Sequence, residues 1–128
     1  MVKAALDGNR GSIKKTENVL EESIVKAIMR WLKALPECEV RKTYGDAKRK
    51  GEADISGCLS GRRFEIEVKR PGKDASELQK AVLSKWARAG ALTGVAHSLD
   101  EAKAILSVQD KKIAFQLRKV QTNDHVTA

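Results

Sequence analysis

Two acidic residues and a lysine in the middle of the chain have the types and spacing that metal-assisted hydrolysis needs. Glu67 and Lys69 lie two residues apart in RFEIEVK, so in a strand they project from one face about 6–7 Å apart. Asp54 opens the preceding predicted strand, ADISGCLS, which a hairpin would bring alongside. Two carboxylates suit Mg²⁺, and a neighbouring lysine could steady the attacking water or the phosphate. The three residues predict metal-assisted phosphodiester hydrolysis.

The charged side of the 63–69 segment also has a purely structural interpretation. Read with period two, the apolar residues fall on one face and the charged residues on the other. A solvated strand face with mutually compensating charges gives the same pattern, so a Glu-x-Lys pair alone does not decide between the two interpretations. The apolar face comprises Phe64, Ile66 and Val68, and the charged face Arg63, Glu65, Glu67 and Lys69.

The surrounding sequence predicts the elements that must position these residues. Helices are predicted where apolar residues recur at helical spacing, and strands where short apolar or alternating runs lie between turn residues. The order α-β-β-β-α-β-α predicts an α/β domain, with a mixed central β-sheet flanked by helices. The predicted helices span 18–35, 76–90 and 98–106, the predicted strands 37–44, 53–60, 63–69 and 92–97, and 111–120 is expected to be an edge strand or a partner-contacting arm.

The totals limit the class of protein. With 128 residues, 41% of them hydrophobic, the chain suits one domain with its own core. A net charge of +8 favours a polyanionic partner, nucleic acid or an anionic membrane surface. No helix joins a basic face to large exposed apolar residues, so we expect nucleic acid and no membrane partner. Cys38 and Cys58 lack the spacing of a zinc site and are expected to be buried reduced thiols.

The residue order in the middle of the chain indicates a particular protein family, which the composition does not. GEADISGCLSGRRFEIEVKRPGKDASELQ, followed by ARAGALTGVAHSLDEAKAIL, resembles the VRR-NUC family, the virus-type replication-repair branch of the PD-(D/E)xK nucleases. The resemblance runs from about Glu21 to Leu106. It includes the G-x-x-D step that ends at Asp54, the E-x-K from Glu67 to Lys69, the following P-G, and Gln79. It implies a PD-(D/E)xK core and nuclease activity.

Carried over to this chain, the resemblance implies specific roles at the site. Asp54 and Glu67 would be metal ligands, the backbone carbonyl of Val68 a further ligand, and Lys69 the catalytic lysine, with Mg²⁺ or Mn²⁺ as the cofactor. Gln79 matches a family glutamine near the site, although a capping box with Ser76 is a sufficient structural reason for it. The family often has proline before the aspartate where this chain has Ala53, which bears on the rigidity of the turn.

The resemblance also implies a glutamate on the first helix near the metal, and the sequence LEESI offers two. At about 100° per residue, Glu21 falls within roughly 60° of the apolar face that carries Ile24 and Ile28, whereas Glu22 is rotated toward solvent. An inward carboxylate is costly unless it is paired, protonated or bound to a metal. Glu21 is therefore the expected site residue, and a capping box with Asn18 is its structural alternative.

Basic residues around the expected site predict how DNA would be held. Such groups neutralise phosphates and read shape more than base sequence. With Trp31 and Trp86 on apolar helix faces, no base-stacking platform is evident, which favours duplex or branched DNA. The expected DNA-binding residues are Lys48, Arg49, Lys50, Arg63, Arg70, Lys73 and Gln79.

The resemblance implies a structure-selective DNA endonuclease, because stand-alone VRR-NUC proteins of this length resemble phage enzymes that cut four-way (Holliday) junctions as homodimers. The alternatives are a flap or single-strand nuclease of the same family, and a non-catalytic basic DNA-binding module. We expect a flexible basic lead (1–17), a nuclease domain (18–106), and a C-terminal edge strand or dimer arm with a frayed tail (107–128). The expected location is the cytoplasm, of a bacterial host if the protein is phage-encoded.

Overall fold

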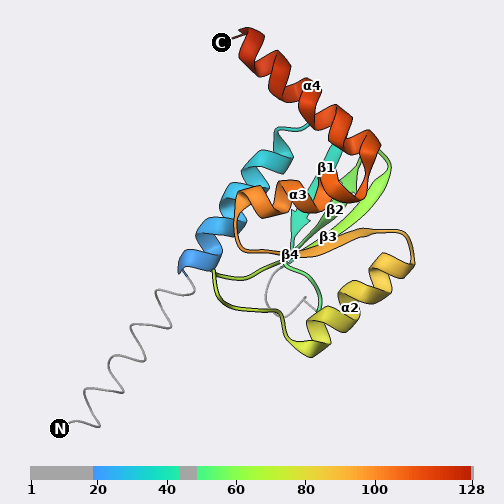
Figure 1. Ribbon diagram of the computed structural model, residues 1–128. Helices are drawn as coiled ribbons and strands as arrows, with labels where there is room; N and C mark the ends of the chain where they lie inside the picture. Colours follow the sequence, from blue (N-terminus) through green and yellow to red (C-terminus); the bar gives the residue numbers. More distant parts are fainter. Residues whose placement is uncertain (1–18, 44–48, 128) are drawn as a thin grey trace, which may run out of the picture.

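A four-stranded mixed sheet forms the centre of the protein (Figure 1). The computed structural model describes residues 19–43 and 49–127. The strands, in spatial order, are β1 (Cys38–Lys42), β2 (Ile55–Leu59), β3 (Arg62–Val68) and β4 (Leu92–Ala96). The first three pair antiparallel, and β4 pairs parallel to β3. The expected α/β class, with a mixed central sheet flanked by helices, is confirmed.

The β2–β3 hairpin fixes which residues share a face. Leu59 pairs with Arg62, which leaves Ser60 and Gly61 as a two-residue loop. Both have positive φ, 51° and 86°, the combination of a type I′ turn, whose twist matches that of the flanking strands. Sequence alone placed this turn one residue later, at Gly61 and Arg62. Ile55 pairs with Ile66 in the resulting register.

Four helices surround the sheet among the described residues. An N-terminal helix covers residues 19–33, and α2 (Glu77–Arg88) connects β3 to the parallel β4. The chain then continues through α3 (Leu99–Gln109) and α4 (Lys111–Thr127). In Figure 1, α2 lies at the lower right, away from the N-terminal helix and α3, while the end of α4 projects from the body of the molecule.

The main core lies between one face of the sheet, the N-terminal helix and α3. Ile28 and Leu32 of the helix are fully buried, and so are Phe64 and Ile66 of β3. The same cluster includes Leu106 of α3. The apolar face predicted for the 63–69 segment is confirmed as a core face.

The other face of the sheet carries the charged residues and is covered by α2. The guanidinium of Arg63 stacks over the Trp86 ring of α2, 4.5 Å from the ring centroid. Because this face is polar, α2 buries little of its own apolar surface: Leu83 is buried, whereas Leu78 and Trp86 are exposed. The expectation that Trp86 belongs to a buried apolar face of this helix was therefore wrong.

The C-terminal segment is a helix, so the edge strand predicted for 111–120 was wrong. Ile113, Phe115 and Leu117 alternate as in a strand, but Ile113, Leu117 and Val120 also follow helical spacing. Ile113 is buried, Leu117 and Val120 pack against the core, and Phe115 is exposed, as a helix requires. Asp110 initiates α4, because its Oδ1 accepts hydrogen bonds from the backbone N–H groups of Lys112 and Ile113.

Two smaller expectations also changed. Cys58 is exposed and Cys38 half-buried, both with free thiols, so the prediction of two buried cysteines was wrong. The backbone helix of α4 runs to Thr127, where a frayed tail was expected from residue 121. No helix among residues 19–43 and 49–127 is long and apolar enough to span a membrane.

Candidate active site

Asp54 and Glu67 lie across from each other where β2 begins and β3 ends. The pairing of Ile55 with Ile66, extended by one residue, places Asp54 opposite Glu67 on the same face of the sheet. Asp54 Oδ2 accepts a hydrogen bond from the backbone N–H of Val68 at 2.9 Å. The hairpin therefore brings together the two carboxylates that the sequence separates by thirteen positions.

Glu67 is almost completely buried, with 2% of its surface exposed. It takes part in polar interactions, and its Oε2 atom is nevertheless a buried oxygen that accepts no hydrogen bond in the described part of the chain. A buried carboxylate is costly unless its oxygens are satisfied by donors or by a cation. Glu67 is therefore not a solvated strand residue, a property that it shares with Glu65, whose Oε2 is also a buried oxygen without a hydrogen bond among the described residues.

The backbone at Val68 and Lys69 is oriented toward different sides of β3. The Lys69 N–H donates to Ala96 O of β4 at 3.0 Å, whereas the Val68 N–H donates to Asp54. In a strand, the N–H and C=O of one residue point to the same side. The Val68 carbonyl therefore points toward Asp54, and the half-buried Lys69 projects from the same strand face as Glu67.

Glu21 reaches the same end of the sheet from the N-terminal helix. Its Oε1 accepts a hydrogen bond from the backbone N–H of Arg70 at 3.3 Å, one residue after Lys69. Glu21 is half-buried and Glu22 exposed, as the helical geometry predicted. Asn18, the partner in the alternative capping box, lies outside the described residues.

The donor set suits Mg²⁺ or Mn²⁺ bound through few protein ligands. Mg²⁺ is commonly held by one or two carboxylates, with water and substrate phosphate completing its coordination. Asp54, Glu67 and the Val68 carbonyl supply oxygen donors in one place. Among the described residues, no three His, Cys, Asp or Glu side chains lie close enough together to hold a metal ion, so Glu21 does not complete a closed cage.

Glu65 lies on the same strand face as Glu67 but has different neighbours, a difference that the sequence did not indicate. Its Oε1 accepts hydrogen bonds from Arg63 Nη2 at 2.8 Å and Nε at 3.2 Å. Burial raises the pKa of the Glu65 carboxyl, and the Arg63 charge opposes that shift. The Trp86 ring covers the guanidinium. Arg63, predicted to bind DNA, thus also stabilises a buried carboxylate.

The remaining basic residues lie on loops around the site. Arg49, Lys50 and Lys73 are exposed and Arg70 is half-buried, while Lys48 lies outside the described residues. The Arg49 backbone N–H donates to Glu52 Oε2 at 2.8 Å. Arg70 and Lys73 flank the Pro-Gly turn directly after Lys69.

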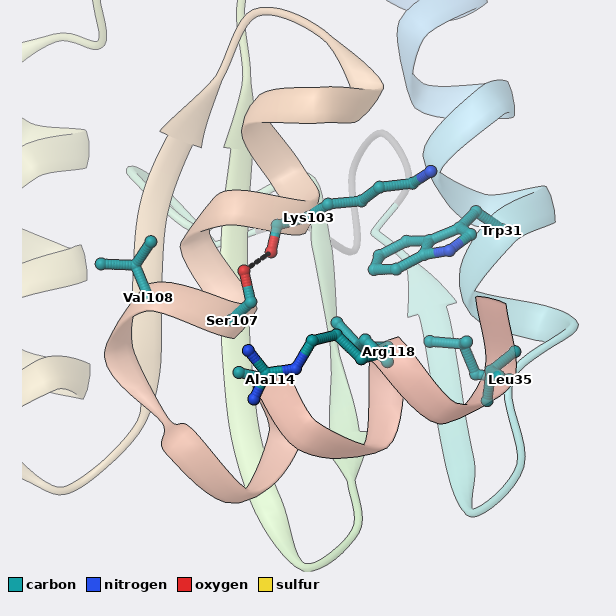
Figure 2. Close-up of a pocket in the computed structure, with 9 residues that line it drawn as sticks. Trp31, Leu35, Lys103, Ser107, Val108, Ala114 and Arg118 are labelled. Carbon is teal, nitrogen blue, oxygen red and sulfur yellow. Dashed lines mark hydrogen bonds between the residues drawn. The ribbon is translucent and has the colours of Figure 1, made fainter. Parts of the chain in front are cut away.

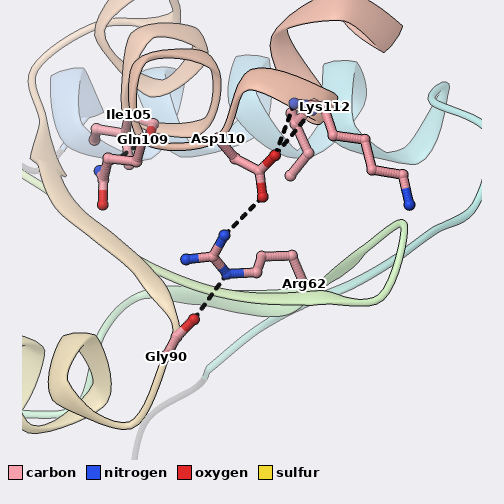
Figure 3. A network of polar contacts seen from close by, with 7 residues as sticks. Arg62, Gly90, Ile105, Gln109, Asp110 and Lys112 are labelled. Carbon is pink, nitrogen blue, oxygen red and sulfur yellow. Dashed lines mark hydrogen bonds and ion pairs between the residues drawn. The ribbon is translucent and has the colours of Figure 1, made fainter.

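Arg62 has a structural role although its position suggests DNA contact. Figure 3 shows its guanidinium between two parts of the chain. Its Nε donates to Gly90 O at 2.8 Å, and its Nη1 pairs with Asp110 at 2.6 Å. Arg62 thus ties the start of β3 to the loop after α2 and to the start of α4.

Gln79 and Ser76 form the predicted capping box of α2. Ser76 Oγ accepts from the Gln79 N–H at 3.1 Å, and Gln79 Oε1 accepts from the Ser76 N–H at 2.8 Å. A similar pattern at the start of α3 forms only half a capping box: Ser98 Oγ accepts from the Glu101 N–H, but the Glu101 carboxylate contacts His97. Sequence analysis assigned no role to His97, and its position directly after β4 was the available signal.

A separate apolar hollow of about 450 Å³ lies between the N-terminal helix, α3 and α4 (Figure 2). Trp31 lines it, with the Lys103 ammonium 5.5 Å from the ring centroid. Val108, at its rim, and Phe115, on α4, are both exposed. This hollow contains none of the residues of the candidate site.

Comparison with known proteins identifies the fold. No protein-family model and no curated protein matches the chain. A solved structure described as a VRR_NUC domain matches it with a TM-score of 0.56 and 24% identity, over 67% of this chain and 94% of that one. The fold is therefore that of a VRR-NUC domain, as the resemblance predicted.

Proposed function

We propose that the protein is a Mg²⁺- or Mn²⁺-dependent nuclease that hydrolyses DNA phosphodiester bonds at the site of Asp54, Glu67 and Lys69. The observation that carries the proposal is the placement of Asp54 opposite Glu67, with the Val68 backbone between them. The VRR-NUC fold supports it. The net charge of +8 supports a nucleic-acid substrate.

Each residue contributes a distinct step to this proposal. Asp54, Glu67 and the Val68 carbonyl would hold the divalent ion, which lowers the pKa of water and neutralises charge on the phosphate. Lys69 orients the attacking water and stabilises the negative charge that develops on the phosphoryl oxygens. Glu21 holds the backbone at Arg70 and so fixes the strand end that carries Lys69. We propose Glu21 as an outer contributor to the metal site.

The proposed substrate is branched DNA, with four-way junctions as the preferred form. Arg49, Lys50, Arg70 and Lys73 lie on loops around the site and would bind phosphates, which gives recognition of shape. We propose the same role for Lys48 and for the exposed part of Arg63, and a DNA contact by the Gln79 amide. The cytoplasm of a bacterial cell is the proposed place of action.

A homodimer would give two active sites related by two-fold symmetry, which suits the symmetry of a four-way junction. Val108, which lines the hollow of Figure 2, and Phe115 of α4 are exposed apolar residues, and they support a contact through α3 and α4. If this surface makes the dimer, Phe115→Lys lowers the mass measured by light scattering from that of a dimer to that of a monomer. An unchanged mass would exclude this surface.

The test of nuclease activity is cleavage of linear duplex, flap, single-strand and four-way junction DNA with Mg²⁺ and with Mn²⁺, mapped at nucleotide resolution. Asp54→Asn keeps an oxygen that can accept the Val68 N–H and removes the ligand charge. Lys69→Ala removes the ammonium, and Lys112→Ala, an exposed lysine of α4, is its matched control. We expect the first two variants to lose cleavage and keep DNA binding, and the third to cut normally.

The results of this panel also separate the alternatives. Paired symmetric cuts at the junction support a junction-resolving enzyme. Cutting confined to flaps or single strands supports the other family activity. Tight binding with no product under either metal would leave a non-catalytic basic DNA-binding module as the better description.

A further inference from the structure

His97 holds the loop that follows Lys69. It directly follows β4, the parallel neighbour of β3, so it lies next to the end of the strand that carries the candidate site. Its Nε2 is 2.7 Å from the carbonyl oxygen of Lys73, and its Nδ1 is 2.8 Å from Glu101 Oε1. One imidazole therefore connects the loop to the first turn of α3.

The two contacts specify the charge of the ring. A backbone carbonyl oxygen can only accept a hydrogen bond, and so can an ionised carboxylate. The pKa of the Glu101 carboxyl is lowered, chiefly by its hydrogen bond with His97, so the carboxylate is the form present near neutral pH. A neutral imidazole has a single N–H, and only the imidazolium can donate to both partners at once.

The loop held by His97 carries two of the basic residues proposed to bind phosphate. Arg70 begins it, and its backbone N–H is bound by Glu21. Lys73 supplies the carbonyl that His97 binds, and its own N–H closes a turn onto Arg70 O at 3.1 Å. Asp74 pairs with Lys80 of α2 at 2.7 Å. His97 thus holds the loop at Lys73, between the anchors at Arg70 and Asp74.

We propose that His97 is a positioning residue whose imidazolium clamps the 70–74 loop to α3, and that loss of its proton releases Lys73 and weakens DNA binding at the candidate site. This inference rests on the proposed DNA-cleaving function. Because both ring nitrogens are already bound, His97 does not act as the general acid or base of the reaction. It acts through the loop.

The sign of the pH effect follows from the charges that face the ring. Glu101 of α3 is the main charged contact, Asp74 is the charge that acts on the ring from the loop, and Lys73 contributes its backbone carbonyl. Lys80 of α2 pairs with Asp74. The pKa of His97 is raised above its usual value of 6.5, first by the hydrogen bond to Glu101 and then by the Lys73 carbonyl. The clamp is therefore complete below pH 6.5 and is lost as pH rises through the folded-state pKa.

The test pairs two neutralising substitutions in the first turn of α3. Glu101→Gln removes the charge that faces His97 but keeps an oxygen as acceptor. Asp100→Asn makes the same charge change one residue away, at an exposed side chain. The His97 ring is titrated by NMR in each protein, with a His125→Gln variant to assign the two histidine signals. The backbone amides of 70–74 are followed in the same spectra.

DNA affinity is then measured between pH 6 and 9 with Ca²⁺ in place of Mg²⁺, so that no cleavage is needed. In the wild type, affinity should fall about threefold to tenfold as His97 loses its proton, the range for one charge-assisted hydrogen bond at a partly exposed site. In Glu101→Gln the fall should occur at lower pH, and in Asp100→Asn at the wild-type pH. His97→Gln, which has an amide donor and no charge, should show no fall in this range.

Two results would overturn the clamp: a His97 that titrates at or below its usual value, or the same pH dependence of affinity in Glu101→Gln and Asp100→Asn. The amide signals of 70–74 must also shift with the His97 titration. These readouts need no catalysis, so the absence of cleavage would contradict the proposed nuclease while leaving the clamp to be judged by the titration.

Discussion

Two glutamates on β3 have the same exposure and opposite surroundings. Glu65 and Glu67 lie two residues apart on one strand face, and each is 2% exposed. Glu65 is neutralised within the fold by Arg63, which Trp86 covers. Glu67 lies at the open end of the hairpin, opposite a second carboxylate, Asp54.

The comparison teaches that burial does not mark a functional carboxylate by itself. What separates the two residues is the side chain placed beside each: Arg63 pairs with Glu65, whereas the hairpin register places Asp54 opposite Glu67. Two adjacent carboxylates favour a bound cation, whereas a carboxylate already paired with Arg has little need of one. Substitutions of Glu67, Glu65 and Arg63 test this contrast.

The largest expected effect comes from exchanging each glutamate for its neutral isostere. Glu67→Gln should lower the single-turnover cleavage rate at least about a hundredfold. Removing a group that hydrogen-bonds to a metal ligand already costs about 10–100-fold in activity, and replacing the ligand itself should cost more. Glu65→Gln should retain cleavage within about threefold, since it removes a charge that the protein itself compensates. Equal losses in the two variants would remove the distinction between the sites.

The next effect is on folding. Arg63→Ala leaves the buried Glu65 carboxylate without its cation, and the free energy of unfolding should fall by about 1–3 kcal/mol. Urea denaturation at pH 7 measures it. Combining Arg63→Ala with Glu65→Gln should recover part of the loss, because the double variant has no unpaired charge to bury. A loss that is the same with and without Glu65→Gln would show that the Trp86 contact dominates.

A third prediction concerns pH. The pKa of Glu65 is raised above 4.5 by burial, so the native state binds its proton more tightly than the unfolded state. The contribution of the Glu65 carboxyl to the free energy of unfolding is greatest below pH 4.5 and falls as pH rises through the folded-state pKa. The stability difference between Glu65→Gln and the wild type should therefore grow in favour of the variant from pH 4 to pH 7. Urea denaturation at both values measures it, and a constant difference would contradict the raised pKa.

The smallest effect separates the two roles of Gln79. Gln79→Glu keeps the carboxyl-type acceptor that caps α2 but replaces the amide donor with a negative charge. We expect unchanged thermal stability and a loss of DNA affinity of about threefold, the order of one exposed charge contact. Unchanged affinity at low salt would show that Gln79 serves only the helix cap.

Much of the fold could be predicted because local and tertiary requirements agreed. The alternation of Phe64, Ile66 and Val68 gave the core face of β3, and the helical spacing of Ile28 and Leu32 gave the buried face of the first helix. The prediction was wrong at 111–120, where the apolar residues fit a strand and a helix equally well. Packing of Leu117 and Val120 against α3 and the core decided between them.

The candidate site was predictable to a lesser extent. Asp54, Glu67 and Lys69 could be named because a hairpin brings adjacent strands together over a short separation. The contact between Glu21 and Arg70 spans 49 positions. Only the inward orientation of Glu21 on its helix could be anticipated. The His97 contact with Lys73 could not be anticipated, because it joins two loops that lie 24 positions apart in the sequence.

Neighbours a few positions apart fix the periods of the core strands and helices, the Ser76–Gln79 cap of α2, and the presence of two carboxylates and a lysine in one hairpin, so these features could be predicted from the sequence. Which charged residues form ion pairs within the protein is known only from the tertiary structure. Arg63 pairs with Glu65 and Arg62 with Asp110, and the hairpin brings Asp54 opposite Glu67. Charge pairing depends on distances between chain segments, and folding sets those distances.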